Sequence, residues 1–142
     1  MRAKFRGARP RWAFAASLFA GAFGLATVAG GGGVLFSDGD WRRMMGDIVG
    51  FVVWFNFVMG FVYLAGAVGL ALWRSWVVGL AWAIALSTGV VALGFVGHIW
   101  MGGAFEWRTA GALAFRMLFW FGVAVAAGGG VSRRSRSAMR RG

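Results

Sequence analysis

Four long apolar runs, separated by short polar stretches, dominate the pattern of hydrophobic and polar positions along the chain. They predict helices over about 12–29, 48–73, 76–100 and 107–131. A helix that crosses a hydrocarbon core of about 30 Å needs roughly 17–25 apolar residues, so each run is long enough to span a bilayer. Trp prefers the headgroup level, and tryptophans at the predicted ends support these boundaries: Trp12, Trp41, Trp73, Trp76, Trp100 and Trp107.

The stretches between the runs are short. Ser37–Asp47 predicts an amphipathic turn or short helix in the interface, with Asp40 as its N-cap. Arg74-Ser75 and the segment 101–106 read as tight connections. Short connections make consecutive helices antiparallel neighbours, so we expect a single all-α membrane domain, an antiparallel bundle of four transmembrane helices.

A run of glycines, Gly30–Gly33, follows the first apolar stretch. Each Gly costs a helix roughly 1 kcal/mol relative to Ala. The helix therefore either frays at this point or meets a neighbour that packs very close. A strip of small residues on the same helix (Ala16, Ala20 and Gly24) would also permit close approach of two backbones.

Composition agrees with a membrane location. Apolar residues make up 60% of the chain and charged residues 13%, whereas a soluble domain has about 45–50% and about 25%. The first run, with its basic start, also resembles a signal peptide, and we interpret it as a start-transfer helix that is retained.

The net charge of +11 is concentrated in two basic tails, 1–11 and 132–142. We expect these tails to contact anionic headgroups at the cytoplasmic face, not nucleic acid. The basic residues concerned are Arg2, Lys4, Arg6, Arg9, Arg11, Arg133, Arg134, Arg136, Arg140 and Arg141. Arg74 falls on the same side, and Arg42, Arg43 and Arg108 fall on the other. The positive-inside rule then predicts that both termini are cytoplasmic.

Polar residues inside the predicted spans are the candidates for chemistry, because each is costly in lipid without a partner. Arg116 and Asn56 each lie nine residues, about 13 Å, below the outer ends of their helices. His98 and Glu106 lie near the same end. We therefore hypothesise a polar cluster of Asn56, His98, Glu106 and Arg116 that opens to the outer face. The structural alternatives are a packing role for Arg116 or a side chain that extends toward the outer headgroups, an interhelical hydrogen bond for Asn56 and an interfacial position for His98. Tyr63 is interpreted as an aromatic-belt or packing residue.

The sequence offers little support for metal binding or for catalysis. His98 and Met101 are weak candidate ligands for copper or haem, since imidazole and thioether suit both. The chain has one His and no Cys, which excludes disulfides, thiolate metal sites and thiol nucleophiles. We find no phosphate-binding loop and no Ser/His/Asp set, and only four acids. We therefore expect neither an enzyme nor a bound cofactor.

Three segments carry a resemblance: 54–57 (Trp-Phe-Asn-Phe), Gly97-His98, and 102–109 (Gly-Gly-Ala-Phe-Glu-Trp-Arg-Thr). They resemble small, uncharacterised bacterial four-helix inner-membrane proteins over roughly half of the chain. The resemblance implies the bacterial inner membrane as the location, and implies no activity.

Three functional hypotheses follow. The first is a non-catalytic accessory or assembly subunit of a larger respiratory or photosynthetic membrane complex. The second is a small oligomeric transporter or channel that uses Asn56, His98 and Arg116 for an anion or polar solute. The third is a copper- or haem-handling protein that uses His98 and Met101.

Overall fold

A computed structural model describes residues 9–37, 39–44, 46 and 48–139, with the side chains of 41, 42 and 130–139 excepted. Over this part of the chain the secondary structure is all helical. The helices are α1 (Arg11–Phe36), α2 (Asp40–Met44), α3 (Gly50–Ala71), α4 (Trp76–Trp100) and α5 (Trp107–Met139). All except α2 contain a segment long and apolar enough to cross a membrane, which in α5 is Trp107–Gly129.

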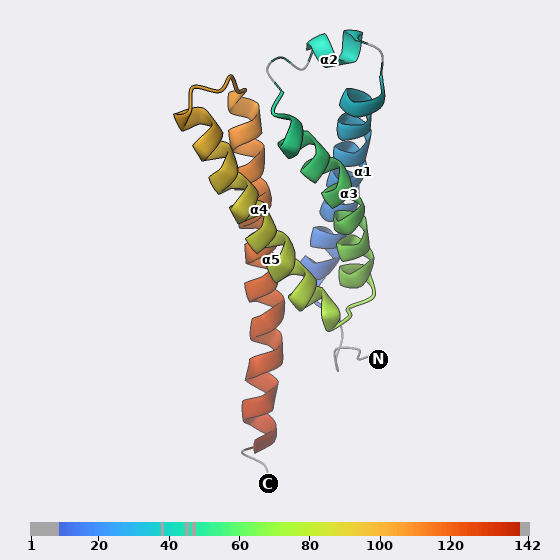
Figure 1. The fold of residues 1–142 in the computed structure, drawn as a ribbon. Coiled ribbons are helices and arrows are strands. Elements are labelled where there is room, and N and C mark those ends of the chain that lie inside the picture. The colour runs from blue at the N-terminus through green and yellow to red at the C-terminus, as the bar shows by residue number, and fades with distance from the viewer. Residues whose placement is uncertain (1–8, 38, 45, 47, 140–142) are drawn as a thin grey trace.

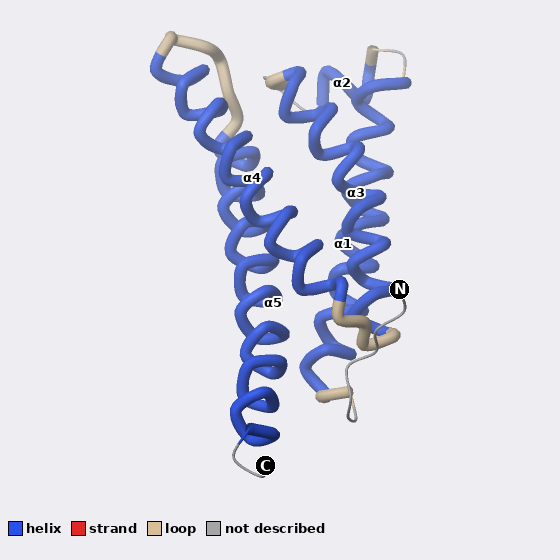
Figure 2. Tube along the Cα trace, turned by 60° about the horizontal axis from the view of Figure 1, so that its bottom comes forward, coloured by secondary structure: helices blue, strands red, loops and turns tan. Residues whose placement is uncertain are grey.

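The long helices form two pairs, in which α1 packs along α3 and α4 packs along α5 (Figure 1). Contact between α3 and α4 is much less extensive, although a short turn joins them. Figure 1 places α2 and the α4–α5 loop at one end of the domain, and the start of α1 and the end of α5 at the other. A second view shows the same two pairs (Figure 2).

α1 is longer than the sequence predicts, because it continues through the glycine run to Phe36 instead of ending near residue 29. A Cβ atom on Gly31 would lie 3.1 Å from the Cβ and 3.2 Å from the Cα of Phe57 in α3. α3 therefore packs very close to the glycine run of α1. This is the second of the two predicted alternatives.

Two other boundaries also differ from the prediction. Gly39, not Asp40, takes the N-cap position of α2, because the Gly39 carbonyl accepts the Arg43 N–H at 3.0 Å. α5 continues as helix to Met139, so the part of the predicted basic tail up to that residue has a helical backbone. Arg is a good helix former, which agrees with this extension.

Two helices also approach closely at Gly24 of α1 and Gly60 of α3. A Cβ atom on Gly24 would lie 3.1 Å from the Gly60 carbonyl oxygen, and one on Gly60 would lie 3.2 Å from the Gly24 oxygen. The predicted strip on α1 faces this seam, since Ala20 and Gly24 are both buried. Backbone contact between α1 and α3 thus rests on residues without side chains.

α3 ends in a Schellman motif with Trp73 at the left-handed position, where φ is 50°. The Arg74 N–H donates to the Gly69 carbonyl and the Trp73 N–H to the Leu70 carbonyl. Trp73 also packs edge-on against Trp12 of α1, with ring centroids 5.7 Å apart.

Arg9 donates a hydrogen bond to the Ala71 carbonyl at the end of α3 and lies over the Phe14 ring. This residue, predicted to contact lipid headgroups, thus ties the start of α1 to α3. Arg11 is exposed at the first position of α1. The other predicted headgroup contacts lie outside the described residues or side chains: Arg2, Lys4, Arg6, Arg133, Arg134, Arg136, Arg140 and Arg141.

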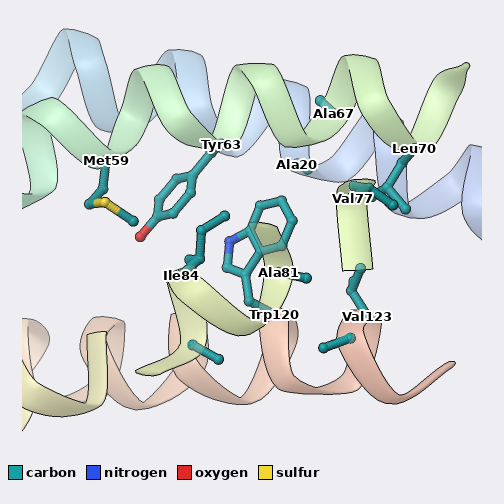
Figure 3. Close-up of a cluster of buried hydrophobic side chains, with 12 residues drawn as sticks. Ala20, Met59, Tyr63, Ala67, Leu70, Val77, Ala81, Ile84, Trp120 and Val123 are labelled. Carbon is teal, nitrogen blue, oxygen red and sulfur yellow. The ribbon is translucent and has the colours of Figure 1, made fainter. Parts of the chain in front are cut away.

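The main core fills the space between the two pairs (Figure 3). Trp120 projects from α5 and Tyr63 from α3 into this space, both fully buried, with ring centroids 5.6 Å apart. A smaller cluster packs α3, α4 and α5 together toward the α4–α5 loop: Val49, Val52, Phe95 and Leu113.

Candidate functional site

A cavity of about 340 Å³ lies between α1, α3 and α5. Its walls are mostly apolar, and no residue of α4 lines it. The lining residues are Phe23, Ala26, Thr27, Gly30, Gly31, Val34, Ile48, Val49, Val52, Val53, Asn56, Glu106, Arg108, Thr109, Ala112 and Arg116. Because Ile48, Glu106 and Arg108 lie at or just before the starts of α3 and α5, the cavity reaches the end of the domain that carries α2.

Arg116 is the buried charge of this cavity, with 8% of its surface exposed. Its Nη1 donates to Asn56 Oδ1 at 2.8 Å, a bond that joins α5 to α3. The guanidinium carbon lies 5.2 Å from the centre of the Phe23 ring of α1. Three helices thus converge on one cation. The arrangement combines one hydrogen bond with a cation–π contact.

The guanidinium is only partly satisfied. It carries five N–H donors, of which one is hydrogen-bonded to a described residue, and its buried Nε has no partner. Among the described residues no carboxylate pairs with Arg116. A buried charge without a counter-ion is costly in an apolar medium, so this site favours an anion.

Helical periodicity explains the convergence. Leu113, Arg116 and Trp120 follow one another at three- and four-residue spacing on α5 and are all buried. Asn56 and Tyr63, seven residues apart, share one face of α3 in the same way. The apolar neighbours on each face pack into the two cores and carry the polar residues inward with them.

A layer of aromatic rings begins at the inner part of the cavity. Phe23, which lines the cavity, stacks on Tyr63 with centroids 6.0 Å apart, and Tyr63 stacks on Trp120. Tyr63 and Trp120 are fully buried and do not line the cavity. Packed side chains thus follow the cavity on the side away from α2.

Glu106 lines the same cavity, but far from Arg116. The two residues are ten positions apart, which corresponds to about 15 Å along a helix. The Glu106 side chain lies against Gly46, which precedes α3. The structure thus brings Asn56, Glu106 and Arg116 to one cavity with the acid at the opposite end from the cation.

His98 is not part of this cavity, contrary to the predicted cluster. Its Nε2–H donates to the Ala104 carbonyl at 3.1 Å, and its ring lies against Gly103. α4 ends in a Schellman motif with Gly102 at φ 80°, which turns the loop back over the histidine ring. His98 therefore holds the α4–α5 loop.

The weak metal candidates are not assembled into a site in the described part of the chain. His98 binds the loop carbonyl, and Met101 is 84% exposed at the C-cap of α4. No group of three or more His, Cys, Asp or Glu side chains comes together among the described residues.

The sequence analysis did not predict that α1 contributes to the site. Phe23 and Thr27 line the cavity one turn apart, followed by Gly30 and Gly31. Thr27 is a hydroxyl residue within an apolar run, and this was the available signal. Nothing in the sequence showed that the glycine-rich half of α1 would face Asn56 and Arg116.

The role of His98 gives a first prediction. A Cβ atom on Gly103 would overlap the His98 ring, so Gly103→Ala must displace the ring from Ala104. We expect the free energy of unfolding to fall by about 1 kcal/mol, the net contribution of one hydrogen bond. The measurement is the midpoint of detergent-induced unfolding. Gly97→Ala is the control, because a Cβ there meets open space, and this helical position should gain up to about 1 kcal/mol from alanine. A Gly103→Ala midpoint at or above the wild-type value would contradict the role assigned to His98.

Four helices long and apolar enough to cross a membrane, with a buried cation at a cavity between three of them, indicate a multi-pass membrane protein. Comparison with protein-family models, curated proteins and solved structures finds no match to this chain.

Proposed function

We propose that this protein is a non-catalytic, multi-pass membrane protein that binds a small anion at Arg116. One observation carries the proposal: the buried Arg116 guanidinium lines a cavity, has one neutral hydrogen-bond partner, and is paired with no carboxylate of the described residues. A bound anion would supply the counter-charge, and charge-assisted hydrogen bonds are about twice as strong as neutral ones.

We further propose an antiparallel arrangement with both termini in the cytoplasm of a bacterial cell, in the inner membrane. The Lys and Arg residues gather in the two terminal segments and at Arg74, whereas Arg42, Arg43 and Arg108 lie at the other side. The positive-inside rule supports this orientation. The cavity would then open toward the outer face.

The aromatic layer bears on the choice between binding and conduction. An open pore through one chain would have to pass the layer formed by Phe23, Tyr63 and Trp120. The geometry therefore favours a binding site, or one state of a transporter that opens to one side at a time, over a channel within a single chain.

The accessory-subunit hypothesis is compatible with this proposal, because the anionic group that binds Arg116 can be part of a partner complex. Large apolar side chains are exposed on all four long helices. Contact with lipid alone explains such exposure, so the cavity and not the surface carries the proposal.

The test is to observe the Arg116 side chain by nuclear magnetic resonance. The full-length protein, labelled with ¹⁵N-arginine in micelles of a neutral detergent, is titrated with sodium acetate while the Nε–H resonances are recorded. We expect one resonance, absent in Arg116→Lys, to move and saturate, while those of exposed arginines change linearly and little. Acetamide is the neutral control. Identical behaviour of all arginine resonances would overturn the proposal.

A further inference from the structure

The chemistry of the cavity also indicates what kind of anion it takes. We infer that the ligand is a small amphipathic monocarboxylate, with its carboxylate at Arg116 and its apolar body along the cavity. This inference rests on the proposed function and narrows the class of ligand. It depends on the charge, the depth and the lining of the site.

The charges favour a single negative charge. One buried cation, Arg116, lies at the inner end, and its hydrogen-bond partner Asn56 is neutral. Glu106 and Arg108 both line the outer part of the cavity, so the charges there offset each other. A dianion such as phosphate would leave one charge uncompensated in an apolar pocket, which is costly. A carboxylate matches one guanidinium in both charge and geometry.

The lining favours an apolar body. Between Arg116 at one end and Glu106 at the other, the walls are formed by residues such as Ala26, Val34 and Val53. A fully hydrated inorganic anion would not use these surfaces. The volume of about 340 Å³ falls at the lower end of the range of about 300–1,000 Å³ that small-molecule sites occupy.

The depth argues against the headgroup of a membrane phospholipid. Arg116 lies nine residues from Trp107 at the start of α5, which is about 13 Å along the helix. A phosphodiester stays at the headgroup level, above this position, because its charge is hydrated there. A compact carboxylate can descend to the guanidinium with its apolar part still inside the cavity.

Gly30 offers a way to block the site without disturbing the fold. It lines the cavity, and a Cβ atom there meets no other atom within 4 Å. Leucine at this position extends into the empty volume. Gly79 of α4 is a matched control, since it is also a helical glycine with open space around its Cβ position and lies outside the cavity.

The experiment measures binding of three probes to the full-length protein in phosphatidylcholine nanodiscs by calorimetry. The probes are 3-phenylpropionate, its neutral analogue 3-phenylpropanamide, and acetate. We expect 3-phenylpropionate to bind about tenfold or more tightly than either of the others, because only it uses both the guanidinium and the apolar wall. Gly30→Leu should lose about tenfold in affinity for it, and Gly79→Leu should keep the wild-type value.

The outcomes separate the two proposals. Equal affinity for 3-phenylpropionate and acetate would overturn the amphipathic ligand and leave anion binding in place. Equal affinity for the acid and the amide would overturn the carboxylate. Loss of 3-phenylpropionate binding in nanodiscs containing phosphatidylglycerol would assign the site to a lipid headgroup and overturn the inference. If acetate produced no saturable change at Arg116 and 3-phenylpropionate did not bind, both proposals would fall.

Discussion

Replacing Gly60 with leucine should separate α1 from α3 and lower the free energy of unfolding by more than about 3 kcal/mol. A Cβ atom on Gly60 would lie 2.6 Å from Cγ2 and 3.0 Å from the backbone nitrogen of Val28. Overpacking costs about 1–3 kcal/mol where side chains can move. Here part of the obstacle is backbone, so the helices themselves must move apart, which would also disrupt the cavity between them.

The measurement is the unfolding midpoint of the purified protein in detergent, followed by far-ultraviolet circular dichroism. Gly60→Ala should show a smaller loss of the same kind. Gly79→Leu adds the same leucine to a helix at a position with open space and, because leucine favours helix over glycine, should unfold at or above the wild-type midpoint. If Gly60→Leu unfolds at the same midpoint as Gly79→Leu, close contact of the α1 and α3 backbones does not stabilise the protein.

The second large effect concerns the contact between Gly66 of α3 and Trp120 of α5. A Cβ atom on Gly66 would lie 2.5 Å from Cη2 of the indole, and Trp120 is fully buried. We expect Gly66→Ala to cost about 1–3 kcal/mol. Trp120→Phe should cost part of the about 3–5 kcal/mol typical of Trp→Ala, because it leaves a void.

Combining Gly66→Ala with Trp120→Phe should restore part of the stability that each change removes. Phenylalanine reaches less far than tryptophan, so the added methyl group of Gly66→Ala can occupy the vacated space. The double variant should be more stable than the sum of the single effects by about 1 kcal/mol or more, within the range found for residues in contact. Gly79→Ala combined with Trp120→Phe is the control and should be additive. Additivity in the first pair would show that the two residues do not constrain each other.

The long helices were predictable because a span of apolar residues is a local property of the chain. The four runs match the helices α1, α3, α4 and α5 to within a few residues at most ends. The exceptions are instructive. The glycine run, read as a local weakness, is helical because Phe57 packs against Gly31, a contact with a residue 26 positions away. Helix propensity yields to such packing.

The candidate site was predictable only in part. Depth along the helices placed Asn56 and Arg116 at one level, and the structure joins them with a hydrogen bond. The same reasoning placed His98 with them, because it lies near the same end of its helix. It failed because the loop after α4 folds back and offers the Ala104 carbonyl to the ring. The partner that His98 takes depends on the geometry of the loop after α4. The position of His98 along its helix does not determine that geometry.

The sequence by itself determined how many apolar helices form, where each begins to within a few residues, and which polar residues lie within them. These properties follow from hydropathy and from the backbone's need to satisfy its hydrogen bonds within each helix. Only the tertiary structure decided that the helices form two pairs, that Phe23 and Thr27 of α1 complete the cavity, and that Glu106 lies at the opposite end from Arg116. These features depend on which helix faces meet. In this chain, glycines such as Gly24 and Gly60 and the bulk of Trp120 set those contacts across long distances in sequence.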